Sequence, residues 1–88
     1  TFRNCKITNT KEHGCIDIEA NGGYSNKHIK FIDCSISVSG GAALAILNSA
    51  DDIVLTGSTI SGGFITNRTG TNVYYNGRAV PIAEIWYP

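Results

Sequence analysis

The chain has 88 residues, and its seven basic and seven acidic side chains give a formal net charge of zero. Such a length supports at most one small domain, which buries only about 60–65% of its unfolded surface. The lack of basic blocks argues against a nucleic-acid partner, and the apolar runs are too short to span a membrane. Abundant Gly, Ser, Thr, Asn and Ile favour strands and tight turns.

The three cysteines, Cys5, Cys15 and Cys34, are an odd number and contain no CxxC pair. A complete disulfide framework and a zinc site are therefore not expected. We expect buried thiols that behave as small apolar residues, which suits a reducing compartment such as the cytoplasm during assembly. No metal and no cofactor are predicted. Because the sequence begins at Thr1 without a signal-peptide pattern, we expect a fragment or a processed product.

A repeat begins at the start of the chain. Segments 2–8, 31–37 and 55–61 share the order large apolar, two variable residues, small residue, polar residue, Ile, hydroxyl. Their large apolar residues are Phe2, Phe31 and Leu55, spaced by 29 and 24 residues. Alternation of apolar and polar residues within each segment indicates short strands.

A second repeat lies between copies of the first. Residues 14–19 match residues 42–47, 28 positions later. Residues 73–75 are a candidate third copy, although residues 66–72 interrupt the pattern. Glycine pairs such as Gly22-Gly23 and Gly62-Gly63 indicate turns between the strands.

These repeats predict an all-β fold, a right-handed parallel β-helix of about three coils spanning residues 1–76. Equivalent strands would lie about 4.8 Å apart as parallel neighbours. Similar residues would then stack into inward columns. We expect three such columns, formed by Phe2, Phe31 and Leu55, by Cys5, Cys34 and Ser58, and by Ile7, Ile36 and Ile60.

The apolar-x-x-Cys/Ser-x-Ile element resembles the coil pattern of the pectate-lyase-like parallel β-helix family, over roughly residues 1–65. The uneven coils and polar turns look most like phage tailspikes. That resemblance implies a homotrimer on the virion tail, assembled in the host cytoplasm, that binds and often cleaves bacterial surface polysaccharide. Secreted pectinases share the fold, so secretion is the alternative localisation, and fold alone does not settle activity.

Residues 77–88 depart from the repeat. Asn76-Gly77 is a strong type I′ turn signal between residues 73–75 and 79–80. The apolar and aromatic stretch that follows is predicted to cap the last coil or to form a trimer contact, because an exposed solenoid end needs a cover.

Asp17 and Glu19 are the candidate catalytic pair, the acid and base of a glycoside hydrolase or polysaccharide lyase. With Ile16 and Ile18 inward, both carboxylates face outward, with Cα atoms about 6.6–6.8 Å apart. This spacing suits the carboxylate separations of glycosidases. Solvated carboxylates are the structural alternative, and Asp33, Asp51 and Asp52 are expected to support bends.

Aromatic side chains are the candidate sugar-binding residues, because their faces offer apolar platforms. We select Tyr74, Tyr75 and Trp86, with Tyr24 and Tyr87 as further candidates and packing as the alternative role. His13 and His28 are expected in turns or on the surface, without a metal. Asn67-Arg68-Thr69 fits the N-glycosylation pattern.

The leading hypothesis is thus a mainly structural segment of a tailspike-like protein that binds bacterial polysaccharide as a homotrimer. The alternatives are a catalytic glycoside hydrolase or polysaccharide lyase domain and a non-catalytic carbohydrate-binding module. A bacterial adhesin passenger is less compatible with free cysteines.

Overall fold

Three β-sheets make up the chain in the computed structural model, which describes residues 1–9 and 15–88. Every regular element of the described residues is a strand. The first sheet contains β1 (Phe2–Arg3), β4 (Asn26–Ile32), β7 (Ala50–Thr56), β10 (Thr71–Tyr75) and β11 (Arg78–Ala79), in that order. The second contains β2 (Lys6–Asn9), β5 (Ser35–Val38) and β8 (Thr59–Ser61). The third runs from β12 (Ala83–Trp86) through β9 (Phe64–Asn67) and β6 (Ala42–Asn48) to β3 (Ile16–Glu19).

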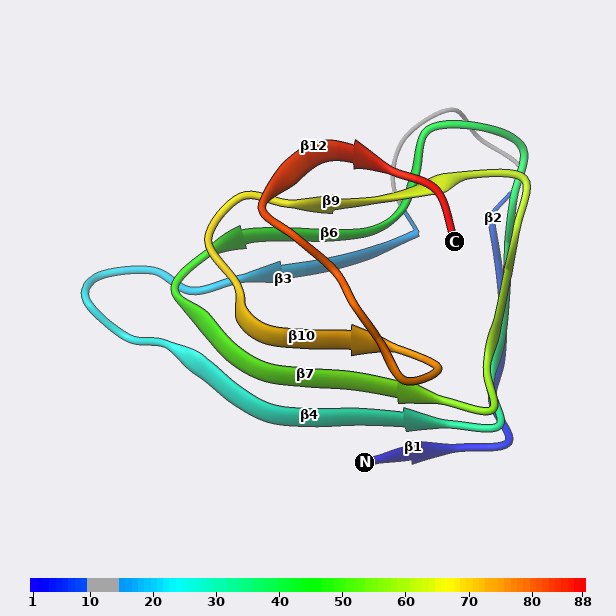
Figure 1. The fold of residues 1–88 in the computed structure, drawn as a ribbon, viewed down its shortest axis with the longest axis horizontal. Helices are drawn as coiled ribbons and strands as arrows, with labels where there is room; N and C mark the ends of the chain where they lie inside the picture. The colour runs from blue at the N-terminus through cyan, green and yellow to red at the C-terminus, as the bar shows by residue number, and fades with distance from the viewer. Residues whose placement is uncertain (10–14) are drawn as a thin grey trace.

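The chain visits the three sheets cyclically, as Figure 1 shows. We call β1–β3, β4–β6 and β7–β9 the first, second and third rounds. Every pairing between one round and the next is parallel. The all-β class and the parallel sheets predicted from the sequence are therefore confirmed.

Equivalent residues of successive rounds are neighbours across the sheets. Phe2 pairs with Phe31, and Phe31 pairs with Leu55. The rings of Phe2 and Phe31 stack with centroids 5.0 Å apart and planes inclined by 13°. Ile36 lies between Ile7 and Ile60 in the second sheet. The predicted apolar columns are confirmed.

The narrow column is held together by polar contacts. The Ser58 hydroxyl accepts a hydrogen bond from the backbone N–H of Cys34 at 3.0 Å. The Cys34 thiol donates to the backbone carbonyl of Phe2 at 3.4 Å. Small side chains are needed here because the chain turns from the first sheet into the second, and Ser58 and Cys34 are both buried.

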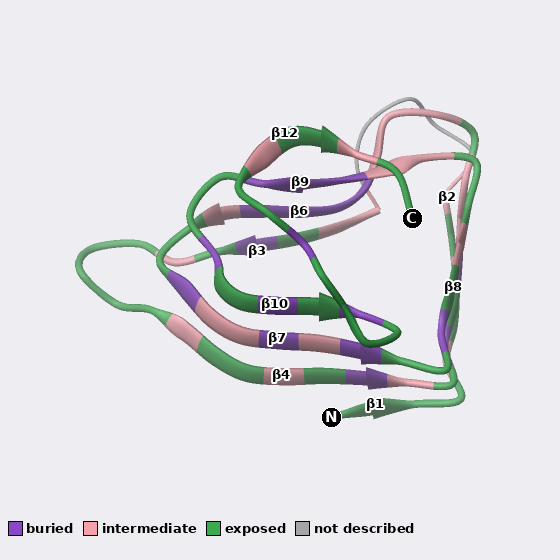
Figure 2. Cartoon of the chain, in the orientation of Figure 1, coloured by how far each residue is buried: buried purple, intermediate pink, exposed green. Residues whose placement is uncertain are grey.

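The core lies between the sheets and is most complete in the second and third rounds (Figure 2). Side chains in these rounds have no exposed surface, namely those of Ile36, Leu44, Ile46, Ile53, Leu55 and Ile65. Burial of such side chains contributes about 1.5–3 kcal/mol each, before chain entropy is considered. The first round is less covered, since Phe2 is 48% exposed.

Left-handed residues make the bend between the first and second sheets. Asn4, Asp33 and Gly57 occupy equivalent positions with φ of 53°, 54° and 61°. Asn, Asp and Gly adopt this conformation most easily. The two variable positions of the repeat therefore include a residue with a specific backbone role.

The sequence-based position of residues 73–75 was wrong. These residues do not continue the third sheet; Val73 and Tyr75 pair with Ile53 and Leu55 in the first sheet. The third copy in the third sheet is β9, where Ile65 pairs with Leu44. The error arose because a short loop brings the chain back to the first sheet only 20 residues after Ile53 (73 − 53).

The register of the third sheet also departs from strict matching. Ile16 pairs with Leu44 and Ile18 with Ile46, as predicted, but Glu19 pairs with Asn48 after an irregularity. A bulge of this kind adds one residue to one strand and alters its twist.

The hairpin predicted at Asn76-Gly77 is present. The two residues have φ of 48° and 84°, as a type I′ turn requires. Tyr75 pairs with Arg78 across it, in antiparallel orientation. The chain then crosses to β12, which pairs antiparallel with β9 and is the outermost strand of the third sheet.

Candidate functional site

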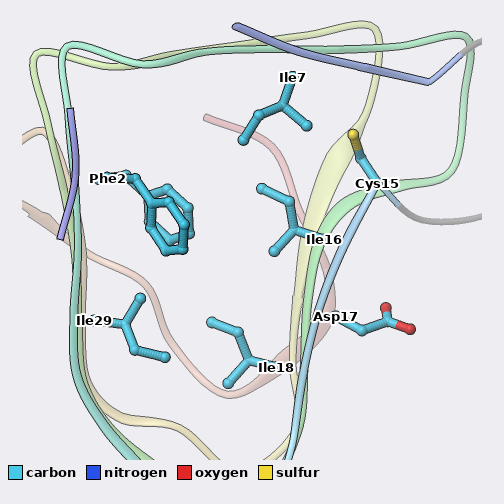
Figure 3. A pocket seen from close by; sticks show the side chains of 8 residues that line it. Phe2, Ile7, Cys15, Ile16, Asp17, Ile18 and Ile29 are labelled. Atoms are coloured by element: carbon cyan, nitrogen blue, oxygen red, sulfur yellow. The ribbon is translucent and has the colours of Figure 1, made fainter. Parts of the chain in front are cut away.

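The outer face of the third sheet carries Asp17 and Glu19 on β3, and both are exposed. Figure 3 shows the Asp17 carboxylate pointing away from the interior, whereas Ile16 and Ile18 point inward. The alternation of the strand puts the two carboxylates on one face, at a Cα spacing of about 6.6–6.8 Å. The structure thus places both residues as predicted, without a further acidic side chain opposite Asp17, which pairs with Ala45.

An ion pair lies on the same face, two strands away. Arg68 donates to both carboxylate oxygens of Glu84, from Nη2 at 2.7 Å and from Nε at 3.1 and 3.2 Å. The hydrogen bonds from Arg68 lower the pKa of Glu84. The same hydrogen bonds, the charge of Glu84 and the more distant charge of Glu19 raise the pKa of Arg68. Both side chains are exposed, so water screens the pair and it contributes little to the stability of the fold.

The predicted aromatic residues do not form one platform. Tyr74 is 40% exposed, whereas its neighbour Tyr75 is only 8% exposed, because successive side chains of a strand face opposite sides. The Tyr75 hydroxyl accepts a hydrogen bond from the Ile60 N–H at 3.0 Å, and its ring meets Trp86 edge-on, with centroids 6.1 Å apart. The Tyr75 ring is therefore a packing element and offers no open face to a sugar.

Trp86 is partly buried and has a cation above it. The Arg78 guanidinium lies 4.8 Å from the centre of the Trp86 ring. The most exposed aromatic rings are those of Tyr24 and Tyr87, at 79% and 68%. Tyr74 is the selected residue whose ring remains available on the outer face of the first sheet.

A polar cluster at the start of β4, β7 and β10 was not selected from the sequence. His28 Nδ1 and Asp52 Oδ2 are 2.7 Å apart. Asp51 accepts hydrogen bonds from Thr71 Oγ1 at 2.6 Å and from Asn72 Nδ2 at 2.8 Å. These two hydrogen bonds, that of Thr71 first, lower the pKa of Asp51.

Left-handed backbone explains this cluster. His28, Asp52 and Asn72 have φ of 60°, 59° and 53°. They interrupt the ladders at equivalent places, between the paired residues 27 and 29, 51 and 53, and 71 and 73. The spacing of His28 and Asp52 by 24 residues, equal to that of Phe31 and Leu55, is the signal that could have found this column.

The glycosylation pattern falls on a buried side chain. Asn67 has no exposed surface. Its Nδ2 donates to the carbonyls of Gly70 and Val80, each at 3.2 Å, and its Oδ1 accepts from the Gly70 N–H at 2.7 Å. Asn67 therefore holds the turn after β9 and offers no accessible amide in the folded chain. His13 lies outside the described residues.

A cavity of about 300 Å³ opens at the first round. Apolar side chains pointing inward line most of it, including Phe2, Ile7, Ile16, Ile18 and Ile29 (Figure 3). Cys15 lies at its rim, where burial raises the pKa of the thiol. This cavity is an uncovered part of the apolar core, because no cluster of polar groups lines it among the described residues.

Within residues 1–9 and 15–88, no three His, Cys, Asp or Glu side chains gather closely enough to hold a metal ion. The same residues include no apolar helix of membrane-spanning length. No family model, curated protein or solved structure matches this chain.

Proposed function

We propose that the chain is a segment of a right-handed parallel β-helix from a phage tailspike-like protein, located on the virion tail, that binds bacterial surface polysaccharide. The observation that supports the solenoid is the cyclic order of strands, with every round-to-round pairing parallel and with equivalent residues in register in the first and second sheets. Right-handed connection is the rule for parallel strands joined in this way.

The role of the segment in this proposal is mainly structural. The two columns that contain Phe31 and Ile36 run through all three rounds and give a rigid support. Polysaccharide would be bound on the outer face of the first sheet, where the Tyr74 ring is accessible. Rigid strands hold such groups at fixed spacings, which suits a repeating ligand.

The second candidate is a catalytic domain, and the outward pair Asp17 and Glu19 is the observation that favours it. In an inverting mechanism, one carboxyl group would protonate the leaving oxygen while the other activates a water molecule. A glycosidic bond lying along β3 would meet both groups.

Measurements of glycan binding and of glycan cleavage together distinguish these functions. The chain is assayed against purified capsular and O-antigen polysaccharides for binding and for release of reducing ends. We expect binding that Tyr74→Ala weakens roughly three- to tenfold, by loss of one stacking face. Lys6→Gln, a change of an exposed side chain in the second sheet, is the control. Absence of binding to every polysaccharide of the panel would overturn the binding proposal.

Cleavage is tested with Asp17→Asn and Glu19→Gln, and with Asp33→Asn as the matched carboxyl-to-amide control. The catalytic candidate requires loss of turnover of at least about a hundredfold in the first two variants, because proton transfer contributes at least that much. Equal turnover in all three variants would remove Asp17 and Glu19 from catalysis.

A further inference from the structure

The two ends of the stack of rounds differ. At the end formed by β10, β8 and β9, which we call the closed end, the first and third sheets end in a further antiparallel strand, and β8 is the outermost strand of the second sheet. The antiparallel strand β11 flanks β10 in the first sheet, and the antiparallel strand β12 flanks β9 in the third. A continuing parallel round therefore has no free edge to pair with in these two sheets.

Two side chains hydrogen-bond to the backbone near the edge of the second sheet at the closed end, at Ser58 just before β8 and at Ile60 within β8. The Asn76 carboxamide accepts a hydrogen bond from the Ser58 N–H at 3.1 Å and donates one to the Ser58 carbonyl at 2.8 Å. The Tyr75 hydroxyl accepts from the Ile60 N–H. The Asn76 carboxamide thus satisfies both polar backbone groups of Ser58, the residue just before β8.

The opposite end, which we call the open end, has no such cover among the described residues. β1, β2 and β3 are the outermost strands of their sheets. Above them lie the exposed ring of Phe2 and the apolar cavity. In the next two rounds the equivalents of Phe2, namely Phe31 and Leu55, are 2% and 0% exposed.

The unpaired part of the β4 edge shows where a further strand would lie. β7 pairs with β4 along its whole length, from Asn26 to Ile32. On its other side β4 pairs with β1 only at Phe31 and Ile32. The slot beside residues 26–30 is collinear with β1, so a strand filling it would lead directly into Phe2.

The rounds of this chain stack on one another through parallel strands and apolar columns. The open end leaves the same kind of surface uncovered. We propose that the open end is a docking surface for one further parallel round of the same design, joined to β1 at Phe2. This inference rests on the proposed solenoid. The round would place a large apolar side chain over Phe2, a small one over Cys5 and an Ile-sized one over Ile7. The closed end of a second copy does not provide a matching parallel round, because its edges in the first and third sheets are already paired with β11 and β12.

A duplicated round tests this directly. A copy of residues 31–54 is fused immediately before Phe2, so that the copied Phe31 stacks over Phe2 at the spacing found between Phe31 and Leu55. We expect the midpoint of thermal unfolding to rise on the order of 5–10 °C. We also expect binding of an apolar fluorescent dye to fall several-fold, and amide exchange of residues 26–30 to slow.

The matched control carries the same extension with the copied Ile36, Leu44 and Ile46 changed to Ser. It should leave the unfolding midpoint and dye binding of the original chain unchanged, because it offers no apolar face. Equal effects of the two extensions would overturn the proposal. Glycan binding is measured separately, so its failure would not be confused with failure of docking.

A second test changes Phe2 in both the original and the extended chain. In the chain as it is, Phe2→Ser should reduce dye binding, since the exposed ring belongs to the docking surface. In the extended chain the same change should lower the unfolding midpoint at least twice as far as in the original. An equal effect in both backgrounds would contradict docking over Phe2. A stable dimer of the original chain with little dye binding would assign the open end to a second copy instead.

Discussion

Asn76 combines two roles in one residue. Its backbone has a left-handed φ of 48° at the first position of the hairpin turn, and its side chain pairs with both polar backbone groups of Ser58. Asparagine suits the position because it tolerates this φ and carries a donor and an acceptor on one planar group. The polar backbone groups of Ser58, in the bend between β7 and β8, are thereby satisfied without another strand.

We therefore expect Asn76→Ala to lower the free energy of unfolding by about 2–4 kcal/mol. Loss of the hydrogen bonds and the left-handed strain of alanine both contribute. Asn76→Gly keeps the backbone freedom and loses only the side chain, so it should be the milder change. Urea denaturation monitored by Trp86 fluorescence measures both. A stability of Asn76→Gly equal to that of the original chain would show that the carboxamide adds nothing.

Single residues also mark what the sequence revealed and what it did not. The columns were predictable because Phe31, Cys34 and Ile36 repeat the chemistry of their counterparts in the other rounds. The pairing of Tyr75 with Leu55 could not be predicted, because the loop after β9 is short and the chain returns early to the first sheet. The outward direction of Asp17 followed from alternation, whereas the contacts of Asn76 and His28 depend on backbone bends that composition does not specify.

Two glycines in turns between strands show how closely successive rounds approach each other. Gly62 and Gly77 have nearly equal φ, 83° and 84°. A Cβ on Gly62 would collide with the backbone carbonyl of Val38 in the preceding round, whereas one on Gly77 would meet open space. The turn before β9 thus requires glycine for conformation and for close approach.

The pair makes a matched comparison. We expect Gly77→Ala to cost about 1–2 kcal/mol, from left-handed strain alone. Gly62→Ala should cost at least twice as much, since the backbone of one round must also shift against the next. Thermal and urea unfolding of the two variants provide the measurement. Similar losses of unfolding free energy in the two variants would mean that the backbone at Gly62 can shift at little cost. The rounds would then be less rigid than their register suggests.

The whole molecule carries apolar groups on its surface at the tail. Ile82, Ile85 and Tyr87 are 61%, 56% and 68% exposed, on the segment that contains β12. Exposed apolar side chains grouped in this way are typical of interaction sites. They would fit the homotrimer that the resemblance to phage tailspikes implies, in which the tails of three copies would cover one another.

Light scattering at several concentrations tests this assembly. We expect a mass near three times the 9.4 kDa of one chain. Ile85→Lys should yield monomers while leaving the strand content unchanged, because the side chain points to solvent in the single chain. Lys30→Glu, a charge change on the exposed face of the first sheet, is the control. A monomer at all concentrations would contradict the trimer.

The difference between the two ends also decides how copies of the chain meet. A stack with identical edges at both ends could add head to tail without limit and grow into filaments. Here the antiparallel strands β11 and β12 occupy the edges of the first and third sheets at one end, so the open end of one molecule finds no matching edge in these sheets on another. We therefore expect the tail that contains β11 and β12 to prevent unlimited head-to-tail growth through the first and third sheets.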